Sequence, residues 1–161
     1  MRLLVPALAL IVAATPVGAA RIIFSGGNWA SIDFGQRCEA RSKAVGARAD
    51  TKPFAGFAFD RAGVRRGQFY VHLNRPARAG ASVIATIGSE PFLLIGKGPW
   101  AWSRNARQQR AMIDAARHAG GMRVEARDER GRRIVDRYLL AGAATAIDAA
   151  AAACAGKTRR Q

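Results

Sequence analysis

The chain has 161 residues, and its 26 lysine and arginine side chains against 11 acidic ones give a net charge of +15. This length suits one domain with a sizeable core. No stretch after the first twenty residues is long and apolar enough to cross a bilayer. The charge favours an anionic partner, such as anionic lipid, lipopolysaccharide or a polyanionic glycan. The alternative is a solvated basic surface with no dedicated partner.

Residues 1–20 have the pattern of a secretory signal peptide. Arg2 gives a positive start, residues 3–14 are apolar, and Pro16 precedes the small residues of positions 17–20. The apolar run is too short for a spanning helix, so we expect cleavage after Ala20, with an uncleaved N-terminal anchor as the alternative. Export places the mature chain in the periplasm, on the envelope or outside the cell, where nucleic acid is an unlikely partner.

The first half of the mature chain predicts strands separated by loops. We interpret residues 21–27 as a lead-in, 28–34 as a strand and 42–53 as a loop. Residues 55–60 alternate, and residues 68–74 form the clearest strand. In that strand Phe69, Val71 and Leu73 face one side, and Gln68, Tyr70, His72 and Asn74 face the other. Such alternation is typical of a sheet with one wet face.

The middle of the chain predicts two more strands, an aromatic segment and a helix. Residues 81–87 are apolar and β-branched, residues 88–91 form a turn, and residues 92–95 begin the next strand. Trp100 and Trp102 then share one face. Ser103 stands where an N-cap belongs, before a helix over residues 105–119 that stops at Gly120.

The last third predicts a hairpin and a second helix. Two strands, 122–127 and 132–140, flank the turn Asp128–Gly131, and a helix follows over residues 143–153. Residues 157–161 form a basic tail. Because short turns join the strands, we expect antiparallel pairing. The prediction is one mainly β domain over residues 21–156, an antiparallel β-sandwich-like fold with two short helices at one side.

The chain has two cysteines, Cys38 and Cys154, 116 positions apart. In an oxidising compartment two cysteines allow one intramolecular disulfide. In the chain-entropy model, a loop of this size contributes roughly 4–5 kcal/mol. The alternative is two buried free thiols.

Several motifs resemble the invasion-associated locus B family of exported bacterial proteins. They are Trp29 shortly before Cys38, a helix that runs into residues 120–124 (GGMRV), and the segment 139–147 (LLAGAATAI). Ala143 stands where that family has an aromatic residue, and the family's additional cysteines are missing. The resemblance implies a periplasmic or envelope-associated β-sandwich-like domain without an established enzymatic mechanism.

The residues of common catalytic sites are sparse. The two histidines, His72 and His118, have no neighbouring ligand at metal-site spacing, and no Gly-x-Ser-x-Gly elbow occurs. We therefore predict no metal site, no cofactor and no catalytic residue. Four aspartates lie near strand ends, where a glycosidase-like pair is conceivable, but we expect most acids to have arginine partners. They are Asp33, Asp60, Asp128 and Asp136.

The best candidate for function is a basic and aromatic binding surface. It comprises Arg65, Arg66, Tyr70, His72, Arg75, Arg78, Lys97, Trp100, Trp102 and Arg104. The alternative is that both tryptophans belong to the core and the arginines solvate the sheet. We expect a non-enzymatic envelope protein that binds an anionic component or a protein partner. An envelope hydrolase using carboxylates or an unrecognised serine is one alternative, and an accessory protein that acts by strand or surface pairing is another.

Overall fold

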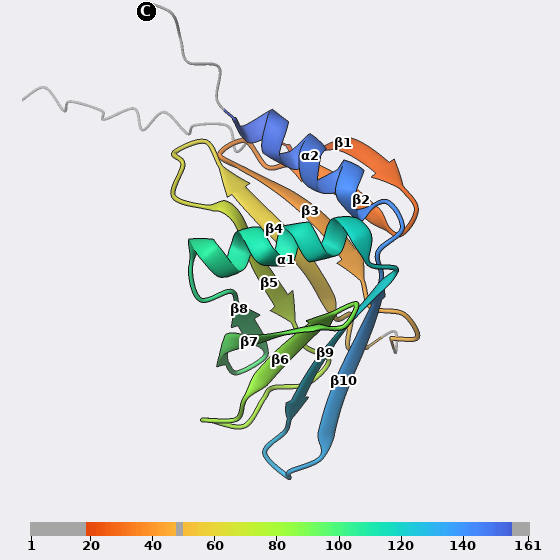
Figure 1. Cartoon of the computed structure of the whole chain (residues 1–161), viewed down its shortest axis with the longest axis vertical. Coiled ribbons are helices and arrows are strands. Elements are labelled where there is room, and N and C mark those ends of the chain that lie inside the picture. The colour runs from red at the N-terminus through yellow and green to blue at the C-terminus, as the bar shows by residue number, and fades with distance from the viewer. Residues whose placement is uncertain (1–18, 48–49, 156–161) are drawn as a thin grey trace, which may run out of the picture.

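The computed structural model describes residues 19–47 and 50–155, and within them ten strands form one antiparallel sheet with two helices (Figure 1). The strands are β1 (Arg21–Gly26), β2 (Trp29–Asp33), β3 (Arg37–Lys43), β4 (Phe54–Asp60), β5 (Arg66–His72), β6 (Val83–Ile87), β7 (Glu90–Lys97), β8 (Trp100–Trp102), β9 (Gly121–Arg127) and β10 (Arg133–Leu139). The helices are α1 (Ala106–His118) and α2 (Ala143–Cys154). The mainly β, antiparallel prediction is confirmed. The expected signal sequence, up to residue 18, and the basic tail lie outside the described residues.

The sheet has the strand order β1-β2-β3-β4-β5-β8-β7-β6-β9-β10 and changes direction at β7. The first half of β7, up to Leu94, pairs with β6, and its second half, from Ile95, pairs with β8. Strand β10, at one end of the strand order, comes back to the segment after β3, since Val45 N–H donates to the Arg137 carbonyl of β10 over 2.7 Å. The Trp29 indole N–H likewise donates to the Leu139 carbonyl. The bent sheet therefore encloses its own core.

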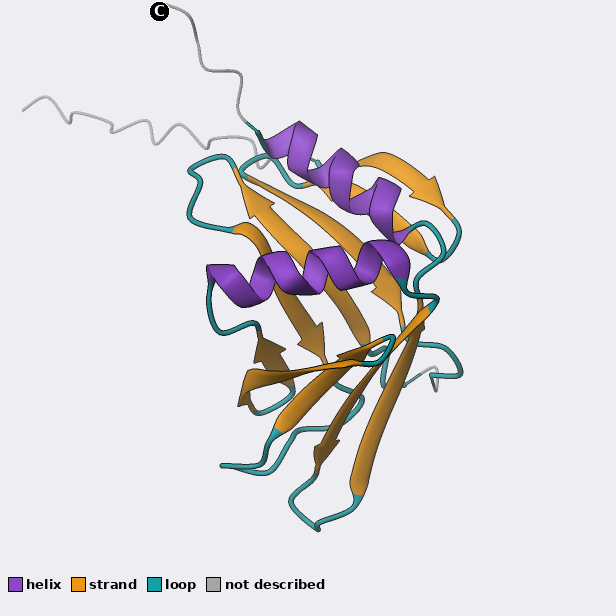
Figure 2. Ribbon diagram, in the orientation of Figure 1, coloured by secondary structure: helices purple, strands orange, loops and turns teal. Residues whose placement is uncertain are grey.

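Both helices lie on the same side of the sheet (Figure 2). Helix α2 packs on β1, β2 and β3, and α1 packs on β5. The alternation of β5 is as predicted, because Phe69 and Val71 are fully buried on the helix side with Phe57 of β4. The opposite side of these strands, turned away from the helices, is called the outer face below.

The disulfide between Cys38 and Cys154 is confirmed, with the two Cα atoms 5.8 Å apart. It joins the last residue of α2 to β3. Two further bonds hold the same helix: the Ser31 hydroxyl donates to the Ala146 carbonyl over 2.5 Å, and the Arg61 guanidinium donates to the Ala153 carbonyl over 2.6 Å. Helix α2 is thus fixed to the sheet in its first turn and at its C-terminal end.

Two glycine turns lie against each other at the start of α2. Gly27 and Gly142 both have positive φ, +59° and +89°, which L side chains rarely adopt. A Cβ on Gly142 would lie 2.2 Å from the Gly26 carbonyl oxygen, and a Cβ on Gly27 would lie 2.2 Å from the Ala141 carbonyl oxygen. Only glycine fits at either position, so the β1–β2 turn and the entry to α2 pack backbone against backbone.

Several predicted boundaries are wrong. Residues 21–27 are not a lead-in, because residues 21–26 form β1, an edge strand whose bulge near Phe24 interrupts the alternation. The predicted loop 42–53 begins too early, since β3 continues to Lys43. The turn after β6 is shorter than expected, because β7 already begins at Glu90. In each case strand pairing extends over residues whose own alternation of apolar and polar side chains is weak.

The predicted N-cap of the first helix is also wrong. Asn105, not Ser103, caps α1, and its side chain accepts a hydrogen bond from the Gln108 N–H over 2.9 Å. Ser103 is buried two residues earlier, where its hydroxyl accepts from the Phe69 N–H of β5. The serine therefore extends the pairing between β8 and β5 and takes no part in the helix.

Candidate functional site

The outer face carries a row of directly paired residues across five strands. Arg41 of β3 lies opposite Gly56 of β4, which lies opposite Tyr70 of β5. Tyr70 lies opposite Trp102 of β8, which lies opposite Ile95 of β7. Directly paired residues of antiparallel strands point to the same face. The register therefore places a guanidinium, two aromatic rings and an aliphatic side chain on one surface.

A second row beside it is mainly aromatic. Phe54 lies opposite His72, and His72 lies opposite Trp100. The Phe54 and His72 rings stack with centroids 5.6 Å apart, and Trp100 meets His72 edge to face at 4.7 Å. The Arg41 guanidinium lies 4.8 Å from the Phe54 centroid, in cation–π range. The packed rings make this part of the outer face a rigid aromatic surface.

Glu39 is the buried centre of an ionic cluster on this face, with 3% of its surface exposed. Arg37 and Arg41 each direct Nε at one of its carboxylate oxygens. The Tyr70 hydroxyl donates to Glu39 Oε2 over 2.5 Å and accepts from Arg41 Nε over 2.7 Å. Burial, followed by the neighbouring Glu39 carboxylate, raises the pKa of Tyr70 far above its ordinary value. Tyr70 is therefore a neutral hydrogen-bond donor.

These side chains surround a pocket of about 260 Å³, called the aromatic–arginine pocket. It is lined by Arg37, Glu39, Arg41, Ala58, Arg65, Gln68, Tyr70, Trp100 and Trp102. Arg65 is held by Asp60, which accepts from Arg65 Nε over 3.2 Å. Within the described chain, no hydrogen bond engages the terminal nitrogens of Arg37, Arg41 or Arg65. Each of the three guanidinium groups thus has its Nε beside a carboxylate, while its terminal N–H donors are open.

The structure gathers only part of the predicted surface. Arg65, Tyr70, Trp100 and Trp102 line the pocket, and His72 and Lys97 lie beside it on the outer face. The alternative that both tryptophans are core residues is wrong, because they are half-buried on the outer face and only Ala101 between them points into the core. Both tryptophans of β8 therefore belong to the surface.

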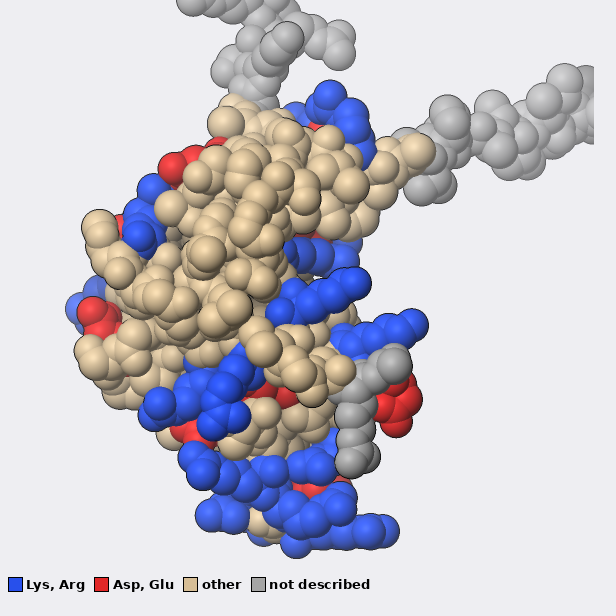
Figure 3. Space-filling model, turned by 90° about the vertical axis from the view of Figure 1, so that its right-hand side faces the viewer, with Lys and Arg blue, Asp and Glu red and all other residues tan. Residues whose placement is uncertain are grey.

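Four residues of the predicted surface lie elsewhere. Arg66 donates to the Gly63 carbonyl in the β4–β5 turn, and Arg104 directly precedes the cap of α1. Arg75 pairs with Asp128 over 3.5 Å, and Arg78 N–H donates to the Arg127 carbonyl. In Figure 3, lysine and arginine gather over the lower part of the molecule, the end where Figure 1 places the β9–β10 turn. This end adds positive charge outside the pocket.

The sequence interpretation missed Arg37, Glu39, Arg41 and Gln68 as members of the site. The signal was present for three of them, because Arg37, Glu39 and Arg41 alternate around Cys38 and Ala40 with the period of a strand. Charged residues on one side and small buried residues on the other are the pattern of a sheet with one wet face. Without a strand assigned to this segment, the three charged residues could not be placed on a common face.

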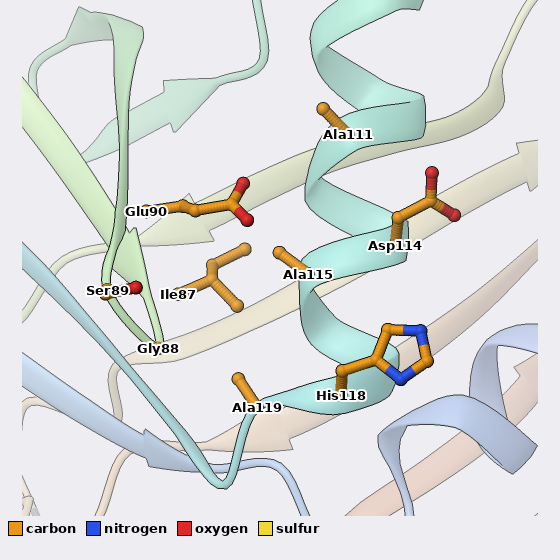
Figure 4. A pocket seen from close by; sticks show the side chains of 9 residues that line it. All are labelled: Ile87, Gly88, Ser89, Glu90, Ala111, Asp114, Ala115, His118 and Ala119. Carbon is orange, nitrogen blue, oxygen red and sulfur yellow. The ribbon is translucent and has the colours of Figure 1, made fainter.

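A second cleft, of about 510 Å³, lies between α1 and the β6–β7 turn (Figure 4). It offers Ser89, Glu90, Asp114 and His118, the residue types of a hydrolase. Glu90 extends toward α1, whereas Asp114 and His118 extend from α1 away from that turn. Over residues 19–47 and 50–155, no hydrogen bond joins these four and no group of three could hold a metal ion. The arrangement does not favour a catalytic triad or a carboxylate pair.

The four aspartates considered for catalysis are engaged separately. Asp33 pairs with Arg61 over 2.9 Å, Asp60 with Arg65, and Asp128 with Arg132 over 2.8 Å. Asp136 is buried and accepts from the backbone N–H of Asn74 over 3.0 Å. Burial raises the pKa of Asp136, against the opposing effect of Asn74. Arginine partners for most of these acids were expected and are present.

Comparison of the chain with models of protein families, with curated proteins and with solved structures gives no match. The resemblance to the invasion-associated locus B family therefore stays a prediction. In the part of the chain that the structure describes, no helix is both long and apolar enough to cross a membrane.

Proposed function

We propose that this is an exported, non-enzymatic envelope protein that binds an anionic envelope component in the aromatic–arginine pocket. The observation that carries the proposal is the convergence of Arg37, Arg41 and Arg65 on one hollow beside Trp100 and Trp102. Planar guanidinium groups recognise phosphate and carboxylate oxygens through paired hydrogen bonds. Indole faces accept the apolar side of a sugar or lipid.

The charges of the pocket support an anion. Glu39 is shared by Arg37 and Arg41, and Asp60 is occupied by Arg65, so three cations face two carboxylates. Because Glu39 and Asp60 form ion pairs on the Nε side, they position the guanidiniums without covering their outer edges. A pre-positioned donor set loses little conformational entropy when a ligand binds.

Export is part of the proposal and has two supports. The first is the signal-peptide pattern of residues 1–20. The second is the disulfide, since such bonds persist in oxidising compartments and are rare in the cytosol. A periplasmic or envelope-associated location would bring the pocket to lipid head groups and lipopolysaccharide phosphates.

The test compares two adjacent arginines. Retention of the purified protein is measured at low salt on immobilised lipopolysaccharide, on immobilised polyphosphate and on vesicles that contain phosphatidylglycerol. Arg65→Gln removes a pocket cation, and Arg66→Gln removes the same charge outside the pocket. We expect Arg65→Gln to weaken retention about tenfold, the worth of one charged hydrogen bond, and Arg66→Gln to have little effect. Absence of retention on all three materials, or equal effects of both variants, overturns the proposal.

A further inference from the structure

Exposed aliphatic side chains continue the outer face beyond the aromatic–arginine pocket. Ile95 is 52% exposed, Leu93 is 41% exposed and Ile84 is 36% exposed. Leu93 and Ile95 alternate along β7, and Ile84 lies opposite Leu93 on β6. The three side chains form one patch, called the aliphatic stripe. Single exposed aliphatic residues are ordinary, but neighbours in register on one face are a surface feature.

The aliphatic stripe joins the pocket directly. Ile95 lies opposite Trp102, which lines the pocket, and Lys97 lies opposite Trp100 on the next row. The outer face therefore changes from guanidinium through aromatic to aliphatic along one row from Arg41 to Ile95. Tryptophan, tyrosine and basic side chains beside an apolar patch are the combination found where proteins meet the interface of a membrane.

We propose that the ligand is an anionic lipid presented in a bilayer, with its head group in the aromatic–arginine pocket and the acyl region against the aliphatic stripe. This inference rests on the proposed function and narrows it. Charge complementarity selects the occupant, because Arg37, Arg41, Arg65 and Lys97 border the face that the stripe extends. A free polyanion would use the pocket alone and would leave the stripe in water. Docking of the outer face on an anionic membrane would use both the aromatic–arginine pocket and the aliphatic stripe.

The experiment removes the two parts separately in the full mature protein. Co-sedimentation is measured with phosphatidylcholine vesicles, with the same vesicles containing phosphatidylglycerol, and in competition with soluble glycerol phosphate. Leu93→Gln with Ile95→Gln replaces two of the three aliphatic side chains of the stripe and leaves Ile84. The matched control is Ile22→Gln with Leu139→Gln, two residues that are 67% and 48% exposed on β1 and β10.

We expect binding to vesicles that contain phosphatidylglycerol and little binding to phosphatidylcholine alone. The Leu93→Gln/Ile95→Gln variant should bind the anionic vesicles about tenfold more weakly, the effect of losing partly buried aliphatic side chains, and the control variant should bind as the wild type does. Soluble glycerol phosphate should compete weakly, because it lacks the acyl part.

The outcomes separate the two proposals. If the stripe variant binds vesicles as tightly as the wild type while Arg65→Gln still weakens binding, the lipid inference is overturned and the anion-binding function stands. If no anionic material binds, both are overturned. If the wild type is a dimer that the stripe variant converts to a monomer, and vesicles are not bound, the stripe is an interface between copies and the lipid inference is overturned.

Discussion

Tyr70 of β5 donates its hydroxyl hydrogen to Glu39 of β3 over 2.5 Å, and the bond passes above the intervening strand β4 at Gly56. A side chain on Gly56 would lie where the phenol lies, because an added Cβ would be 2.8 Å from the Tyr70 hydroxyl oxygen. The pocket thus depends on the absence of a side chain at Gly56. Several measurements can test this dependence and the architecture around it.

Gly56→Ala should destabilise the protein by about 1–3 kcal/mol, as expected for overpacking of a close-packed site. The new Cβ would also lie 2.5 Å from the Ala40 carbonyl oxygen, so neither the strand nor the phenol can easily give way. Denaturant unfolding measures the loss. Gly120→Ala is the matched control, because an added Cβ there meets no atom within 4 Å. Equal stability of the two variants would contradict the close approach of Tyr70 to β4.

Glu39→Gln should lower stability and raise anion binding together. Arg37, Arg41 and Tyr70 all lose a charged partner, for which we expect a loss of about 1–3 kcal/mol in denaturant unfolding. The pocket also becomes more positive, so retention on anionic vesicles at low salt should rise.

The control for this change is Asp148→Asn. Asp148 lies on α2, away from the outer face, pairs with Arg117, and has a side chain that is 59% exposed. It changes the net charge by the same amount and should cost only about 0–1 kcal/mol. If it raised retention as much as Glu39→Gln does, the effect would belong to the overall charge and not to the pocket.

Alkaline pH should unfold the protein as its tyrosines ionise. The chain has two tyrosines, and burial raises the pKa of both, with Glu39 adding to the effect at Tyr70 and Asp136 at Tyr138. In the unfolded chain a tyrosine ionises at about pH 10. The stability from neutral, buried phenols is therefore fully present below that pH and is lost as the pH rises above it.

The measurement follows tyrosinate absorbance and circular dichroism in one titration. We expect the two signals to change together, because ionisation requires exposure of the phenols. Tyr70→Phe should shift the unfolding transition to higher pH after correction for its neutral-pH stability. Tyrosinate absorbance that appears near pH 10 in a fully folded protein would refute the prediction.

Removal of the disulfide should cost about 4–5 kcal/mol in the chain-entropy model, since it closes a loop of 116 residues. Denaturant unfolding of the Cys38→Ser/Cys154→Ser variant measures this loss, and the variant should not respond to reductant. The wild type should lose a similar amount when it is reduced. A reduced wild type as stable as the oxidised one would show that the Ser31 and Arg61 bonds to α2 suffice.

Local pattern was enough to predict several parts of the molecule. The alternation of Phe69 and Val71 located β5, and the turn Asp128–Gly131 located the β9–β10 hairpin. The helix predicted over residues 143–153 is α2, Ala143–Cys154. Each feature is specified by residues close in sequence, where periodicity and turn chemistry act directly.

Local pattern was not enough for edges and caps. Ser103 and Asn105 are both good N-cap residues, and the pairing of β8 with β5 decides between them because it buries Ser103 against Phe69. Strand β1 has no clear alternation, and β2 alone supplies its pairing partner. In both cases contacts between strands, and not the local sequence, determine the structure.

The sequence by itself determined a basic, mainly β chain with two helices and one available pairing, Cys38 with Cys154. Only the tertiary structure decided which face of the sheet the helices cover, and this placed Trp100 and Trp102 on the outside. It also decided the register that brings Arg41, Tyr70 and Trp102 into one row from three separate parts of the chain. Such a row depends on pairing between strands that are far apart in the sequence, and local sequence periodicity does not specify that pairing.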